Sequence, residues 1–184
     1  MIYVLSVPHT GTHYTTDFLE RLGVHWRQLH SQPSSFEDVW WWEPGSKVVI
    51  PMRDPVLQYY STHRRSNEEA TSASLNLASC VSCWRELGRL EERLEGRLDC
   101  ERLWLDRDEL TELKRIAAFA GEPMPANVDT SPKNVNSRYA SPTNYAMWEQ
   151  HLADDKNSDE PNGAKEALEA LKPFRERYGY LAAD

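Results

Sequence analysis

Long hydrophobic runs, cysteine and basic residues are all scarce in this 184-residue sequence. No run of about 18 apolar residues occurs, so we expect no membrane span. The first residues lack a basic leader and a small-residue cleavage site, so we also expect no signal peptide. The three cysteines cannot form a closed set of disulfides. Cys80 and Cys83 have no second cysteine pair and no nearby histidine, which favours unpaired thiols in a cytoplasmic, reducing compartment over a zinc or redox site.

Positive charge is also in short supply. The sequence holds 21 Lys and Arg residues against 29 Asp and Glu residues, for a formal net charge of −8. A broad nucleic-acid surface needs many cations facing phosphates, so we expect none here. Local basic pockets are compatible with this balance.

What is present indicates one folded domain over residues 1–184, since 40% of the residues are hydrophobic and seven are tryptophan. Apolar periodicity predicts strands at 2–7, 24–29, 47–52 and 98–105. It predicts helices from Tyr14 to Leu22, from Pro55 onward, from Trp84 to Leu98, from Asp108 to Gly121 and over 164–178. This alternation predicts a three-layer α/β fold, with a central parallel sheet flanked by helices. Residues 153–163 are polar and punctuated by Gly and Pro, which predicts an exposed connection.

The first motif lies between the opening strand and its helix, and reads Pro8-His9-Thr10-Gly11-Thr12-His13-Tyr14. Gly11 permits a sharp turn, and the following amides sit at a helix N-terminus, an arrangement that suits phosphate oxygens. Thr10 and Thr12 add hydroxyl donors. The pattern is not a Walker A motif, because no lysine occurs in residues 1–46, so a cation would come from His9 or His13. The alternative is an ordinary strand–helix turn with a threonine N-cap.

The second motif follows the strand at 47–52 and reads Arg53-Asp54-Pro55, with Ser61 on the next helix. An arginine at the carboxyl end of a parallel strand points toward the usual ligand edge, and its planar fork suits phosphate. The hydroxyl of Ser61 is placed to reach the same anion. The alternative is a surface ion pair between Arg53 and Asp54.

Together, P-x-[ST]-G-T and R-x-P with a serine eight residues after the arginine resemble the sulfotransferase family. The resemblance implies a P-loop-like α/β enzyme whose donor is 3′-phosphoadenosine 5′-phosphosulfate (PAPS). It assigns the 5′-phosphosulfate to residues 8–14 and the 3′-phosphate to Arg53 and Ser61.

Weaker similarities extend along most of the chain. His30, in Leu29-His30-Ser31-Gln32-Pro33, resembles the family's catalytic histidine. Residues 117–125, 134–138 and 171–180 resemble three later family segments, and Arg138 would add a cation over the donor, as would Lys133. Two features depart from the family: His9 stands where the loop usually has Lys or Arg, and the chain is short.

The resemblance implies in-line sulfuryl transfer to an acceptor hydroxyl or amine, with His30 as base, His9 stabilising the leaving group and no metal. One alternative is a P-loop-type kinase that uses ATP with magnesium held by Asp17 or Asp54. Another is a nucleotide-binding module without catalysis. Trp40, Trp41 and Trp42 either pack in a core or interface, or stack on a ring of the acceptor or of adenine. The sequence names neither the acceptor nor the oligomeric state.

Overall fold

The computed structural model describes residues 1–8, 10–30, 43, 45–61, 77–105, 108–125, 150, 153 and 164–181. The chain divides into two compact units. One comprises Met1–Arg53 and Arg85–Val135 and is called the sheet unit below. The other comprises Asp54–Trp84 and Asn136–Asp184 and is called the helical unit. The prediction of a single domain stays a prediction, and the predicted connection at 153–163 lies outside the described residues apart from Ala153.

The sheet unit is built on four parallel strands in the order β2-β1-β3-β4. They are β1 (Ile2–Ser6), β2 (Trp26–His30), β3 (Lys47–Met52) and β4 (Asp99–Trp104). All four were predicted from apolar periodicity. In register, Ser6 at the end of β1 lies opposite His30 at the end of β2, and Val4 lies opposite Val49 of β3. The carboxyl ends of all four strands therefore meet at one edge.

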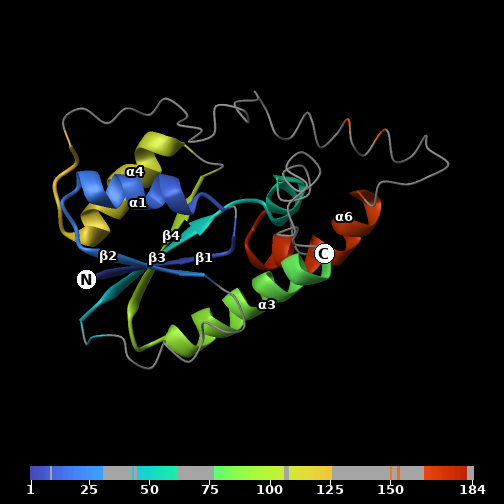
Figure 1. Cartoon of the computed structure of the whole chain (residues 1–184), viewed down its shortest axis with the longest axis horizontal. Helices are drawn as coiled ribbons and strands as arrows, with labels where there is room; N and C mark the ends of the chain where they lie inside the picture. Colours follow the sequence, from blue (N-terminus) through green and yellow to red (C-terminus); the bar gives the residue numbers. More distant parts are fainter. Residues whose placement is uncertain are drawn as a thin grey trace. The chain divides into compact units, whose positions relative to one another are not determined.

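Helices cover both faces of this sheet. The longer helices among the described residues are α1 (Thr12–Arg21), α3 (Leu77–Leu94), α4 (Glu109–Ala120) and α6 (Ala164–Arg177). Adjacent residues of a strand point to opposite faces. Glu101 of β4 pairs with Arg115 of α4, whereas the next residue, Arg102, pairs with Glu91 of α3 at 2.8 Å. The sheet unit thus has three layers, with α1 and α4 on one face and the Arg85–Leu94 half of α3 on the other (Figure 1).

A hydrophobic core fills the space between the sheet and the α1–α4 layer. Every second residue of the strands contributes to it, as expected for a sheet with one face against each layer. Its buried members are Ile2, Val4, Val49 and Leu103 from the strands, Phe18, Leu19 and Leu22 from the α1 region, and Leu113, Ile116 and Ala117 from α4. This packing sets the position of the start of α1 relative to the sheet.

Helix α3 begins at Leu77 and includes Cys80 and Cys83, which the sequence also places in a helix, whereas the leucine stripe alone begins at Trp84. The helix ends at Leu94 rather than at Leu98 as predicted. The stripe of buried residues extends backward through Cys80 and Cys83, which pack as small hydrophobic residues. At the other end, Gly96 adopts a φ of 73° and stops the helix, so that the following residues enter β4.

The helical unit is held by buried polar and aromatic contacts. The indole Nε1 of Trp84 donates to Oε1 of Gln58 at 3.2 Å, and the rings of Trp84 and Tyr178 lie 5.5 Å apart. Residues 55–61 are helical, as predicted from Pro55. Asp54 caps this segment, since its Oδ1 accepts from the N–H of Val56 at 2.9 Å. No helix within the described ranges is long and apolar enough to cross a membrane.

Candidate functional site

The turn between β1 and α1 depends on Gly11. This residue is the N-cap of α1 and has a φ of 94°, in the left-handed region that favours glycine. A Cβ placed on Gly11 would meet Cδ1 of Leu105, which follows β4. The backbone conformation therefore favours glycine, and the Leu105 side chain would have to shift to admit a larger residue. The predicted need for Gly11 has a second cause, its contact with Leu105, that the local sequence does not reveal.

The first turn of α1 presents backbone donors without an acidic cap. Gly11 makes no side-chain cap bond, and the first turn contains no acidic residue. The first intrahelical bond runs from the N–H of Thr15 to the carbonyl of Gly11 at 3.0 Å. Among the described residues, no acceptor takes the N–H groups of Thr12, His13 or Tyr14. These donors, together with the helix dipole, form a local positive end.

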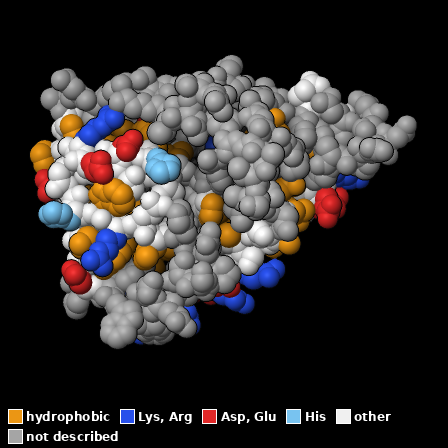
Figure 2. Space-filling view, viewed as in Figure 1, with side chains coloured by type: hydrophobic (Ala, Val, Ile, Leu, Met, Phe, Trp, Pro, Cys, Tyr) orange, Lys and Arg blue, Asp and Glu red, His pale blue; other side chains and the backbone are white. Residues whose placement is uncertain are grey.

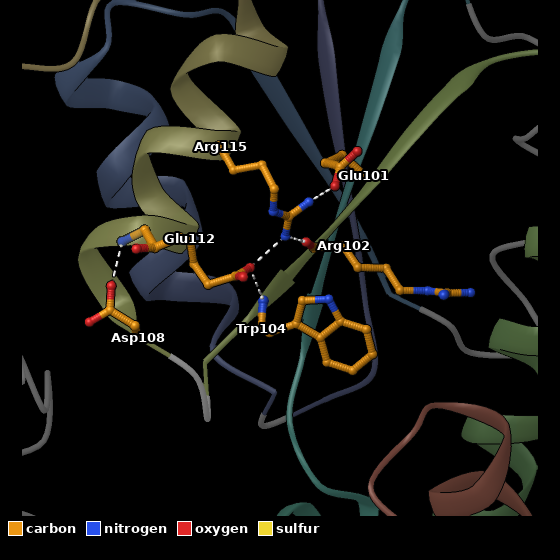
Figure 3. Close-up of polar contacts among 7 residues, drawn as sticks. Glu101, Arg102, Trp104, Asp108, Glu112 and Arg115 are labelled. Atoms are coloured by element: carbon orange, nitrogen blue, oxygen red, sulfur yellow. Dashed lines mark hydrogen bonds and ion pairs between the residues drawn. The ribbon is translucent and has the colours of Figure 1, made fainter.

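Helix α4, which begins at the same edge of the sheet, has an acidic cap at its N-terminus. Asp108 is its N-cap and accepts from the N–H of Thr111 at 2.9 Å, as predicted from the sequence (Figure 3). This hydrogen bond lowers the pKa of Asp108. Glu109 and Glu112 add acidic groups to the first turn. The helix that follows β4 thus supplies its own anion, while the helix that follows β1 does not.

The threonine hydroxyls of the turn have partners inside it. Thr10 is fully buried, and its Oγ1 donates to the carbonyl of Val7 at 2.7 Å. The hydroxyl of Thr12 donates to Oγ of Ser6 at 2.8 Å. These bonds rigidify the turn and leave the backbone amides as its outward donors. The predicted phosphate contacts of Thr10 and Thr12 stay predictions.

Tyr14 binds the neighbouring helix. Its hydroxyl donates to Oε1 of Glu109, the first residue of α4. Burial and then the hydrogen bond and negative charge of Glu109 raise the pKa of Tyr14 well above its usual value. The side chain therefore ties the first turn of α1 to the first turn of α4. No local sequence pattern indicates this link, because the two residues are 95 positions apart.

The strand order brings three predicted site elements to one edge. Because β1 lies between β2 and β3, the turn that begins at Pro8 lies next to His30, the last residue of β2, and next to Arg53, which follows β3. Arg53 is half-buried. From β1 the chain passes to β2 on one side of β1, and then to β3 on the other side of β1. The strand order therefore reverses at β1. Such a switch point is where open α/β sheets bind ligands.

Of the other residues predicted for the PAPS and acceptor sites, only Ser61 is described. Ser61 is at the end of the described helical segment 55–61 and belongs to the helical unit. His9, Arg138 and Lys133 lie outside the described residues, as do Trp40, Trp41 and Trp42. Their roles stay predictions.

The described residues contain no metal cluster, and the two cysteines of α3 are buried. Within the described ranges, no group of three or more His, Cys, Asp or Glu side chains could hold a metal ion. Cys80 and Cys83 are buried in α3, and burial raises the pKa of Cys80 to about 12. Asp54, considered as a magnesium ligand, is 1% exposed, and its Oδ2 accepts from Nη2 of Arg175 at 2.9 Å.

The surface carries mixed charge. Figure 2 shows one face of the molecule, on which Lys and Arg side chains of the described residues lie scattered among acidic and apolar ones.

Comparison with known proteins gives no relative: no protein-family model, curated protein or solved structure matches the chain.

Proposed function

We propose that the chain binds PAPS at the carboxyl edge of its sheet, in a P-loop-like turn, and transfers the sulfuryl group to an acceptor. The observation that carries the proposal is the N-terminus of α1. Its amides have no carboxylate cap and follow the strand at which the sheet order reverses. The equivalent terminus of α4 has an aspartate cap, which the described N-terminus of α1 lacks, and an exogenous anion would fill that role at α1.

The donor nucleotide has two anionic ends, and the proposal gives each one a partner. Residues 8–14 would bind the 5′-phosphosulfate, with the amides of Thr12 and His13 as donors. Arg53, at the end of the adjacent strand β3, would bind the 3′-phosphate through its planar guanidinium. The family resemblance alone assigns Ser61 and Arg138 to donor binding.

His30 would act as the general base. It ends β2, the other neighbour of β1, and is in register with Ser6 immediately before the turn. The oxygen or nitrogen of the acceptor attacks sulfur while the bond from sulfur to the bridging oxygen breaks. The acceptor proton passes to His30, and 3′,5′-ADP leaves with its negative charge stabilised by the amides of the turn and by His9. The products are a sulfate ester or sulfamate and 3′,5′-ADP.

The kinase alternative finds less support. It requires a carboxylate free to hold magnesium near the transferring phosphate. Asp54, one of the two acidic residues considered, bonds to the N–H of Val56 and to Arg175 instead. The turn after β1 also has no lysine to bridge the phosphates.

Ligand-dependent thermal unfolding tests the donor assignment. The chain is heated with 3′,5′-ADP, with 5′-AMP, or with ATP and magnesium. We expect 3′,5′-ADP to give the largest rise in Tm, because it alone among the three ligands carries the 3′-phosphate that Arg53 is proposed to bind. A ligand at about 100 times its Kd stabilises the fold by about 2.7 kcal/mol. Arg53→Ala should remove the preference for 3′,5′-ADP over 5′-AMP. Arg89→Ala, which removes an exposed arginine of α3, is the matched control.

Two results would count against the proposal. Stabilisation by ATP with magnesium alone would favour the kinase, and an unchanged preference for 3′,5′-ADP in Arg53→Ala would remove the assignment of Arg53. His30→Ala should leave the Tm shift by 3′,5′-ADP intact, because a base that acts on the acceptor does not hold the donor.

A further inference from the structure

The outer edge of β4 has backbone groups that bond to side chains of α4. Within the described sheet β4 is the last strand. The N–H of Leu105 donates to the carbonyl of Met52 at 3.0 Å, which sets the alternation along β4. The backbone groups of Leu103 and Leu105 point to β3, so those of Arg102 and Trp104 point away from it.

Two residues of α4 bind these outward groups (Figure 3). Oε2 of Glu112 accepts from the N–H of Trp104 at 3.1 Å, and Nη2 of Arg115 donates to the carbonyl of Arg102. The same Nη2 lies 2.5 Å from Oε2 of Glu112, and the other terminal nitrogen of Arg115 pairs with Glu101. Glu112, the acceptor, and Arg115, the donor, thus bond to each other as well as to the outer edge of β4.

This pair reproduces the bonding pattern of a neighbouring strand. In a parallel sheet, one residue of the next strand donates its N–H to residue i−1 and accepts from the N–H of residue i+1. Around Leu103, those two positions are Arg102 and Trp104. Arg115 supplies the donor and Glu112 the acceptor. Glu112 is only 7% exposed, so its carboxylate is committed to these contacts.

We propose that Glu112 and Arg115 form an edge cap that stands in for a fifth strand and bars β4 from pairing with the β4 edge of a second copy of the chain. An open strand edge is a template for another strand, and proteins protect it with charged side chains. Two identical edges meet naturally across a two-fold axis, which makes a second copy the partner that the cap must exclude. The edge cap is independent of the proposed donor site.

The test removes both partners together. Removing only Arg115 would leave the buried Glu112 carboxylate without its cation, which destabilises a fold for other reasons. The double variant Glu112→Leu with Arg115→Met keeps side-chain bulk and removes the bonding groups. Glu112→Gln is the matched control, because its amide oxygen still accepts from Trp104. Residue-resolved hydrogen exchange and sedimentation velocity at several concentrations are the two measurements.

In the wild-type chain and in Glu112→Gln, the Trp104 amide should exchange slowly. In the double variant it should exchange about tenfold faster or more, since its acceptor is lost, while the Leu103 amide bonded to β3 keeps its protection. The double variant should also gain mass with concentration beyond the wild type. An unprotected Trp104 amide in the wild-type chain would overturn the proposal, even if the double variant failed to fold. A folded double variant with wild-type mass at every concentration would overturn the exclusion of a second copy.

Discussion

At the scale of single residues, Gly11 combines a positive φ with a close neighbour at its Cβ position. Gly11→Ala places a side chain at positive φ and against Leu105. Gly23→Ala is the control, because Gly23 has a φ of 71° and nothing within 4 Å of its Cβ position. We expect Gly23→Ala to cost about 1–2 kcal/mol of unfolding free energy from backbone strain. Gly11→Ala should cost about 1–3 kcal/mol more from overpacking, measured by urea denaturation.

The extra cost should depend on the neighbouring side chain. In a Leu105→Ala background, Gly11→Ala should cost no more than Gly23→Ala, because the atom that it meets is gone. Equal urea midpoints for Gly11→Ala and Gly23→Ala in the otherwise unchanged chain would contradict the contact between Gly11 and Leu105.

Because of Tyr14, the free energy of unfolding should change with pH in the alkaline range. Its pKa is raised in the folded chain, so the folded state holds the phenol proton more tightly than the unfolded state, whose value is 10.0. The resulting stabilisation is full below pH 10 and is lost as the pH rises above it. Tyr14→Phe should lower the free energy of unfolding by about 1 kcal/mol at pH 7. Urea denaturation at pH 7 to 11 should show this difference shrinking above pH 10.

Glu109→Gln provides the matched control for that hydrogen bond. It keeps an acceptor for the Tyr14 hydroxyl but removes the negative charge that raises the pKa. A pH-independent difference between Tyr14→Phe and the wild-type chain would show that the bond to Glu109 does not form.

At the scale of elements, α6 is attached to the start of the 55–61 helix by a buried ion pair. Nη2 of Arg175 lies 2.9 Å from Oδ2 of Asp54, and the two side chains are 15% and 1% exposed. Arg175→Met leaves a buried carboxylate without its cation, so we expect a loss of about 3–5 kcal/mol in unfolding free energy. Lys172→Met on the same helix removes an exposed ion pair to Glu176 and should cost less than about 1 kcal/mol. Similar urea midpoints for the two variants would contradict the buried pair.

Elements marked by local signals were predictable from the sequence. Asp108 and Gly121 mark the ends of α4, and both caps are confirmed. The start of α3 was not predictable from leucine spacing, because buried cysteines continue its apolar stripe. The edge cap depends on β4 lying at the outside of the described sheet, which is a property of strand order rather than of spacing. Strand order is set by packing between distant segments, and no local pattern encodes it.

At the scale of the whole molecule, the α/β architecture and the parallel sheet follow from alternating strands and helices, and both are confirmed within the sheet unit. Their consequence is that the turn after β1, His30 and Arg53 share one edge. The sequence predicted that Tyr14 belongs to this turn, but only the fold shows that its hydroxyl binds Glu109. The division into two units came from contacts between distant segments, and nothing in the composition marks the boundary at Arg53.

The central claim is that an anionic nucleotide binds the N-terminus of α1, and an NMR titration tests it most directly. A ¹⁵N-labelled chain is titrated with 3′,5′-ADP while the amides of Thr12 and His13 are followed, with Thr111 at the capped N-terminus of α4 as the internal control. We predict saturable shifts at Thr12 and His13 and none at Thr111. Saturable binding that leaves Thr12 and His13 unshifted, or no binding at all, would contradict the account.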